Sequence, residues 1–172
     1  LHRCNNLKIL ATSRSTLGLR EEVLVKVAPM ALPGKREASR ELREWGGQTA
    51  EWFLQFDSIR LFIDCTQRKL PEFHLNNAAT ATAVLKICQY LEGIPLAIEL
   101  AAARMGSLTL HNLLAQMTDR FPALSIADRT KPNRHSTLLT ALEWSYGLLT
   151  PTQRSLLAQF SVFRGGADLN AI

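Results

Sequence analysis

The sequence lacks most features that mark catalysts and membrane proteins. No run approaches the ~20 uninterrupted apolar residues that a membrane-spanning helix needs. There is no G-x-x-x-x-G-K-[ST] loop to hold phosphates, and no apolar strand ends in paired carboxylates for Mg²⁺. The four histidines are isolated, and no Ser/His/Asp or Cys/His spacing stands out. We therefore expect this chain not to be an enzyme by itself.

Cysteine is scarce as well. Cys4, Cys65 and Cys88 are widely spaced and form no C-x-x-C pair. The last two fall on the apolar faces of expected helices, which favours small core residues over metal ligands or a disulfide. This cysteine usage predicts a cytoplasmic protein. The chain opens with neither a signal peptide nor a methionine, so we expect a fragment of a longer protein.

The 172 residues are 47% hydrophobic, enough to bury a core as one or two domains. The net charge of +5 raises the question of nucleic-acid binding. The basic residues are scattered, however, except for a cluster at 129–135 that lies among Pro and Asn. A solvated linker is the favoured interpretation of this cluster, and a DNA-contacting patch is the alternative.

A helix–turn–helix corner at 91–105 organises the chain. Gly93 suits the position just past a helix end, where φ is often positive. Pro95 suits the first turn of the next helix, where its missing N–H has no intrahelical partner. From Leu96 onward the residues are apolar nearly all round, which predicts a buried helix. Glu99 and Arg104, inside this helix, are expected to pair with neighbours for structure.

Capping residues and periodicity predict helices along most of the remaining chain. The first expected helices are Lys35–Trp45, Asp57–Lys69 with Asp57 as N-cap, one to Leu91 capped by Asn76 or Asn77, and a short one capped by Thr109. Further helices are expected from Ser136 or Thr137, from Thr150-Pro151 to about Phe163, and after a cap at Asp168. The helix after Thr150 is expected to bury Leu156, Leu157, Phe160 and Val162. Two short strands are expected at Leu7–Ala11, an apolar run, and Glu22–Val27, an alternating one. The aromatic residues at 45–56 favour a core role over a cofactor cage.

Three further blocks flank the Gly-Ile-Pro corner. They are Leu7–Arg14, Asp119–Phe121, and Trp144–Leu149 with Ser161–Gly166. With the corner, these blocks resemble signal-transducing STAND ATPases, kin of the NB-ARC domains, and most closely the bacterial LuxR-type and SARP-type transcriptional regulators. The resemblance runs from about Leu7 to the last residue.

This resemblance implies a mainly α fragment of a larger switch. Its segments would be the C-terminal end of an α/β NTPase domain (1–33), a variable linker (34–56), a helical lid domain with the Gly-x-Pro motif (57–127), a second linker (128–135) and the start of a winged-helix domain (136–172). The partners of the two strands would lie upstream of residue 1. The wing strands would lie beyond Ile172.

The resemblance also implies a set of nucleotide contacts. Arg14 would be the sensor arginine that reads the terminal phosphate, with Ser13 beside it, and Gly93, Ile94 and Pro95 would pack on the adenine and ribose. ATP or ADP with Mg²⁺ would bind in the parent protein, not tightly to this fragment. The alternative for Arg14 is an ordinary solvent-facing arginine after a strand, and the alternative for the corner is a helix–turn–helix with no ligand; the nucleotide roles are the favoured interpretation.

Two functions compete on this basis. The first is a fragment of a STAND ATPase switch, whose partners are an upstream P-loop domain and downstream sensor or effector domains, with DNA bound through other domains and no membrane. The second is a helical DNA- or protein-binding module of a transcriptional regulator without a nucleotide role. The expected helix after Thr150 carries Arg154 as its one basic residue, and this is too little positive charge for several phosphate contacts. We therefore expect the switch.

Overall fold

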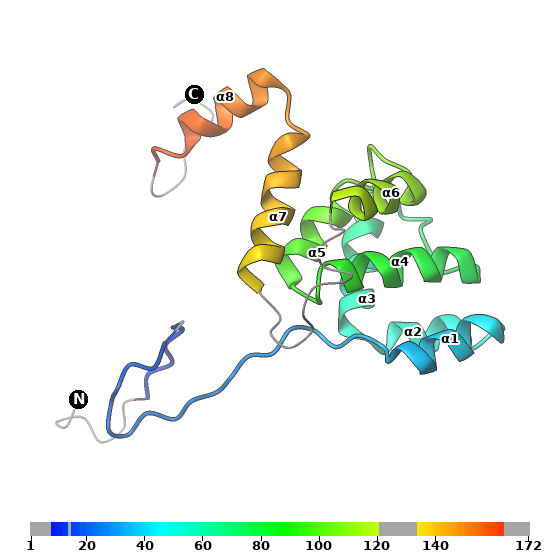
Figure 1. Ribbon diagram of the computed structural model, residues 1–172, viewed down its shortest axis with the longest axis horizontal. Coiled ribbons are helices and arrows are strands. Elements are labelled where there is room, and N and C mark those ends of the chain that lie inside the picture. Colours follow the sequence, from blue (N-terminus) through cyan, green and yellow to red (C-terminus); the bar gives the residue numbers. More distant parts are fainter. Residues whose placement is uncertain (1–7, 14, 121–133, 164–172) are drawn as a thin grey trace.

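Helices account for all regular structure in the described part of the chain. The computed structural model describes residues 8–13, 15–120 and 134–163. In chain order the helices are α1 (Lys35–Arg43), α2 (Thr49–Leu54), α3 (Asp57–Gln67), α4 (Ala78–Tyr90), α5 (Pro95–Ala102), α6 (Leu110–Arg120), α7 (Arg134–Gly147) and α8 (Pro151–Phe160). No residue in these ranges belongs to a β-strand, so the expectation of a mainly α chain is confirmed (Figure 1).

The two expected strands are not confirmed among the residues described. The stretch from residue 8 to residue 28 is irregular, and Figure 1 shows it running away from the helices. Ile9, Leu10 and Val23 are 64%, 96% and 86% exposed. A strand is stable only when a neighbouring strand takes up its backbone hydrogen bonds. The described residues contain no such neighbour, so strand-forming side chains alone do not produce a strand.

The core lies among α3, α4, α5 and α6. Helix α3 packs on both α4 and α5, and α4 packs on α6. Each of these four helices contributes fully buried side chains, including Phe62, Val84, Ile98 and Leu113. The stripes expected on α3 and α4 are confirmed, because all their members are buried: Ile59, Phe62, Ile63 and Thr66, and Ala81, Val84, Leu85, Cys88 and Leu91.

Helix starts follow the expected capping chemistry, with one exception. Asn77 caps α4, accepting a hydrogen bond from the Thr80 N–H at 2.8 Å, and Thr109 caps α6 in the same way at 3.2 Å. Asp57 was expected to cap α3, but it is the first helical residue, and the N-cap Phe56 makes no side-chain cap bond. A carboxylate in the first turn still favours the helix, because it lies at the positive end of the dipole.

Residues 34–56 contain two helices that pack on this core. Helix α1 lies against α4, and α2 lies against α3. Phe53 is fully buried, and the Trp52 ring meets it edge-on with centroids 4.9 Å apart. The aromatic residues of this stretch are core residues, as their spacing predicts. No capping residue or apolar period predicted α2 as a separate helix.

Helices α7 and α8 form an arm that projects from the bundle (Figure 1). Helix α7 lies against α5, and its buried residues include Thr137, Ala141 and Trp144, which share one face. Helix α8 has no buried residue. The expectation that Leu156, Leu157 and Val162 are buried is therefore wrong: these side chains are 42%, 50% and 78% exposed.

Their exposure has a simple physical reason. A helix buries an apolar stripe only when another element covers it, and among the described residues none covers α8. A winged helix is thus not confirmed. The expected cap at Asp168, the segment 128–133 and the block at Phe121 lie outside the described residues. None of the described helices is long and apolar enough to cross a membrane.

Candidate functional site

The α4–α5 corner is built from two consecutive left-handed residues. Glu92 has φ 51° and Gly93 has φ 66°, so the positive φ expected at Gly93 is confirmed. The Glu92 N–H donates to the Gln89 carbonyl at 3.1 Å, and the Gly93 N–H donates to the Cys88 carbonyl at 3.2 Å. This pair of bonds is the Schellman motif, which satisfies the last carbonyls of α4. Pro95 then starts α5 at the first helical position.

The chain that enters α1 packs directly on this corner. The Met30 N–H donates to the Gly93 carbonyl at 2.9 Å, and a Cβ at Gly93 would collide with the Met30 carbonyl oxygen. Next to it, the Ser58 hydroxyl of α3 donates to the Ala31 carbonyl at 2.6 Å. Gly93 therefore has two structural reasons to be glycine, namely its φ and the close approach of the Met30 backbone.

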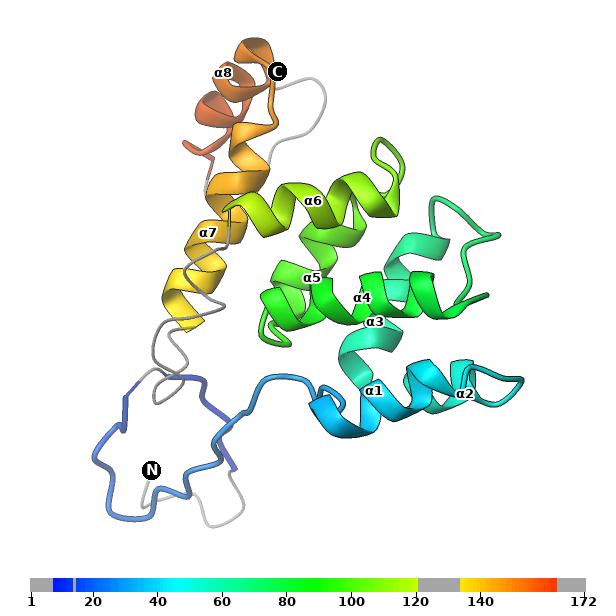
Figure 2. The ribbon, with the colours of Figure 1, turned by 45° about the vertical axis from the view of Figure 1, so that its right-hand side comes forward.

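The residues expected to contact a nucleotide are only partly assembled. Gly93 is buried, Ile94 is half-buried and Pro95 is exposed. Ser13 is exposed, its hydroxyl oxygen accepts from the Ser15 N–H at 3.3 Å, and it lies in the segment that leaves the bundle (Figures 1 and 2). Arg14 lies outside the described residues. The structure thus does not bring Ser13 to the corner, and the nucleotide roles of these residues stay predictions.

Arg104 ties the corner helix to the arm. Its guanidinium Nη2 donates to the Ser145 carbonyl at 2.9 Å and to the Ser145 hydroxyl at 3.1 Å. The structural role expected for Arg104 is confirmed, although the sequence did not indicate its partner. Because Arg104 follows α5 and Ser145 lies in α7, these two bonds fix the angle at which the arm leaves the bundle.

The turn between α7 and α8 is also fixed. Thr150 and Gln153 form a reciprocal capping box at the start of α8. The Arg154 guanidinium donates to the Gly147 carbonyl at 2.9 Å and lies 5.1 Å from the centre of the Tyr146 ring. The one basic side chain of α8 is therefore engaged within the arm.

The arm carries a set of exposed apolar side chains, which we call the apolar arm surface. Its members, between 42% and 78% exposed, are Leu139, Leu142, Tyr146, Leu156, Leu157, Val162 and Phe163. Figure 2 shows α8 beyond the end of the bundle, where neither α3 nor α4 reaches it. Exposed apolar side chains repeated along two consecutive helices make this arm a candidate protein interaction site.

The cysteines have no reactive setting. Cys88 is fully buried in the core, and burial raises the pKa of its thiol to about 12. Burial also raises the pKa of the half-buried Cys65, a rise that the nearby Arg68 opposes. Within the described ranges no group of three His, Cys, Asp or Glu side chains could hold a metal ion. The core role expected for Cys88 is confirmed, and Cys4 lies outside the described residues.

The chain is similar over its whole length to parts of longer mycobacterial proteins. It is 34% identical over 172 residues to a Mycobacterium tuberculosis protein named "Putative HTH-type transcriptional regulator", covering 100% of this chain and 17% of that protein. It is 36% identical over 170 residues to a second Mycobacterium tuberculosis protein, named "Uncharacterized protein", covering 99% of this chain and 37% of that protein. No family model and no solved structure matches the chain.

These similarities support one part of the sequence-based resemblance. The chain is related to proteins named as HTH-type transcriptional regulators, and this agrees with the expected relationship to transcriptional regulators. The names say nothing of STAND, NB-ARC or LuxR proteins. The chain spans about a third and about a sixth of the lengths of these relatives.

Proposed function

We propose that this chain is a helical protein-binding module of a transcriptional regulator, and that the apolar arm surface docks against another domain of that regulator. The observation that carries this proposal is the contrast within α8. Its start is fixed by a capping box and by Arg154, yet none of its residues is buried. A helix with a fixed position and uncovered leucines is suited to a protein partner.

The chemistry of the arm favours protein over DNA as its partner. A helix that reads DNA needs free basic or amide side chains for phosphates and base edges. Arg154 is engaged by Gly147 and Tyr146, and Gln153 by the capping box with Thr150. The exposed side chains of α8 then include Leu156 and Leu157 beside the polar Ser155 and Gln159, with no second basic residue. Burying one such leucine side chain contributes about 1.5–3 kcal/mol, so a few of them supply a stable contact.

The relatives supply the setting for such a contact. The one named as a transcriptional regulator contains this segment within a chain about six times as long. A docking partner on the same polypeptide is held at high effective concentration, so a surface of modest size is enough. This argument supports an intramolecular partner.

The test is a pair of double variants in a full-length regulator that contains this chain. Leu156→Glu/Leu157→Glu places two carboxylates on the apolar arm surface. Leu54→Glu/Leu70→Glu is the matched control, because its leucines are 39% and 38% exposed and lie outside the arm. We expect the arm variant to lose regulated transcription while the control retains it. Equal output from both variants would refute the docking role.

A second candidate function is the nucleotide switch of the STAND resemblance. The observation that favours it is the extended stretch before α1, where exposed side chains include Ile9, Leu10 and Val25. An α/β domain would cover these strand-forming side chains with neighbouring strands. In this proposal Arg14 and Ser13 contact the terminal phosphate of ATP, and Gly93, Ile94 and Pro95 contact the base. The packing of Met30 on Gly93 weighs against the last of these contacts.

Paired ATP and ADP titrations of the longer protein test this candidate. A guanidinium that bonds the terminal phosphate contributes roughly 1.5–3 kcal/mol, or about ten- to a hundredfold in affinity. Arg14→Ala should therefore weaken ATP binding by that factor and leave ADP binding unchanged. If both nucleotides weaken equally, Arg14 has a structural role and the switch proposal fails. The chain alone should bind neither nucleotide at micromolar concentration, because it has no phosphate loop.

A further inference from the structure

We propose that the exposed basic face of α1 binds the phosphate backbone of duplex DNA. The side chains that share this face are Lys35, Arg36, Ser39, Arg40 and Arg43. At about 100° per residue they span about 140° of the helix circumference. The opposite side of α1 carries the buried Ala38 and faces α4. The basic residues are thus gathered on the outer side of the molecule.

The charges on this face are largely unneutralised. Among the residues that the structure describes, the single ion pair joins Arg40 and Glu41 at 3.3 Å, and the Arg40 side chain is 67% exposed. No carboxylate of the described residues lies within ion-pair distance of Lys35, Arg36 or Arg43. An exposed pair such as Arg40–Glu41 contributes little, so it does not prevent Arg40 from contacting a second anion.

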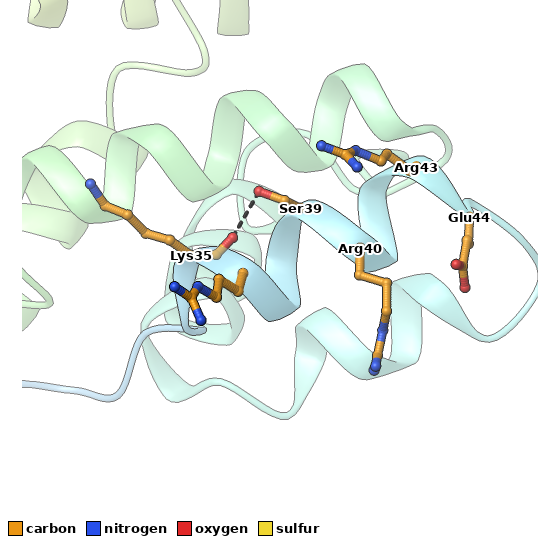
Figure 3. Close-up of a pocket in the computed structure, with 6 residues that line it drawn as sticks. Lys35, Ser39, Arg40, Arg43 and Glu44 are labelled. Carbon is orange, nitrogen blue, oxygen red and sulfur yellow. Dashed lines mark hydrogen bonds between the residues drawn. The ribbon is translucent and has the colours of Figure 1, made fainter.

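The shape of this face suits an extended polyanion better than a small molecule. A shallow hollow of about 460 Å³ follows α1, and all six of its lining residues belong to this helix or its last turn. Figure 3 shows Lys35 and Arg43 at the two ends of the face, with Ser39 between them. A small-molecule site needs walls from several elements, whereas this hollow is lined by α1 and the residue that follows it alone. Glu44 lines its far end and supplies one negative charge against four positive ones.

The dimensions fit a nucleic-acid strand. Lys35 and Arg43 are eight positions apart, which corresponds to about 12 Å along the helix axis. Phosphates of one DNA strand advance ~3.4 Å along the duplex axis, so the face is long enough for about three of them. Exposed lysine and arginine side chains neutralise phosphates whatever the sequence, and we therefore expect mainly backbone contacts with little sequence preference.

The position of α1 leaves the proposed docking surface free. Figures 1 and 2 both place α1 at the end of the molecule away from α8. DNA on α1 and a protein domain on the apolar arm surface can thus bind at the same time. This inference does not depend on the arm, and either proposal can fail without the other.

Fluorescence anisotropy with a short labelled duplex tests the assignment on the whole chain. The variant Arg36→Ala/Arg43→Ala removes two charges from the face, and alanine preserves the helix. The control Arg60→Ala/Arg68→Ala removes two exposed arginines of the same type from α3 and its last turn. Circular dichroism of both variants checks that they remain folded.

We expect the α1 variant to bind the duplex about tenfold more weakly between about 50 and 200 mM salt, with the slope of log K against log salt reduced in magnitude by about 2. The control should bind within about twofold of the parent chain. Equal weakening in both variants would overturn the assignment, because it would reflect net charge alone. Displacement of the duplex by a polyglutamate peptide at equal charge concentration would also overturn it in favour of an acidic protein partner.

Discussion

Leucine has opposite environments in the two parts of this molecule. Leu113 in α6 is fully buried, whereas Leu157 in α8 is 50% exposed. Both lie in helices that start with a well-formed N-terminal cap, at Thr109 and Thr150 respectively. The comparison teaches that local chemistry decides where a helix forms, while burial depends on what lies opposite. The bundle of α1–α6 and the inner face of α7 cover each other's apolar side chains, whereas no residue of α8 is buried.

The largest effect is expected at the corner that closes the bundle. Gly93→Ala places a Cβ against the Met30 carbonyl oxygen and adds the cost of a left-handed φ. Because the clash is with backbone, it cannot be relieved by a rotamer change, and we expect a loss of about 4 kcal/mol in the free energy of unfolding. Urea denaturation measures it. Gly47→Ala is the control, since nothing lies within 4 Å of its Cβ and its stability should be nearly unchanged.

Matched leucine substitutions test the comparison directly. Leu113→Ala removes a fully buried side chain and should cost about 3 kcal/mol, through lost burial and the cavity left behind. Leu157→Ala removes a half-exposed side chain and should cost less than about 1 kcal/mol. Both values come from the same denaturation experiment. Similar costs at the two sites would show that α8 is packed as tightly as α6.

The core thiol predicts a decline in stability at high pH. Burial raises the pKa of Cys88 from 9.0 to about 12, so the folded chain holds its proton after the unfolded chain has lost it. The unfolding free energy should be unaffected by this group below pH 9, and should fall by about 1.4 kcal/mol per pH unit between about 9 and 12. The variant Cys88→Ala should lack this component. Parallel slopes for variant and parent would contradict the burial of the thiol.

A smaller effect is expected where the two parts meet. Arg104→Ala removes two hydrogen bonds to Ser145 and should cost about 1.5 kcal/mol, because both bonds have a charged donor. The loss of stability should be confined to α7. Its backbone amides should exchange hydrogen faster, while the exchange of the α4 amides is unchanged. Arg60→Ala, at an exposed site on α3, should affect neither helix. Uniform acceleration across the chain would show that the arm and the bundle unfold as one unit.

Local signals predicted much of this fold. Asn77, Thr109 and Thr150-Pro151 marked helix starts, and the stripe from Ala81 to Leu91 marked the buried face of α4, because capping and periodicity act within a few residues. Local signals could not decide whether strands form at 7–11 and 22–27. Their apolar residues fit a strand, but the partner that decides whether a strand forms is not in the local sequence.

The candidate sites were predicted less completely, for a related reason. The tight turn at Gly93 could be read from Gly-Ile-Pro, but the contact from Met30 lies about sixty residues away in the chain. Arg154 could be recognised from the sequence as the one basic residue of α8, but only the fold shows that Gly147 and Tyr146 engage it. The basic face of α1 was visible as alternating charges, and its meaning depended on knowing that Ala38 faces α4.

Among the described residues no element covers α8, and we propose that α8 gains a covering partner in the full regulator. Amide hydrogen exchange of α8, measured in the chain alone and in the full-length protein, tests it most directly. We predict fast exchange in the chain alone and at least about tenfold slower exchange in the full-length protein, since docking of the leucines suppresses local opening, with α4 equally protected in both. Equal exchange of α8 in the two proteins would contradict the account.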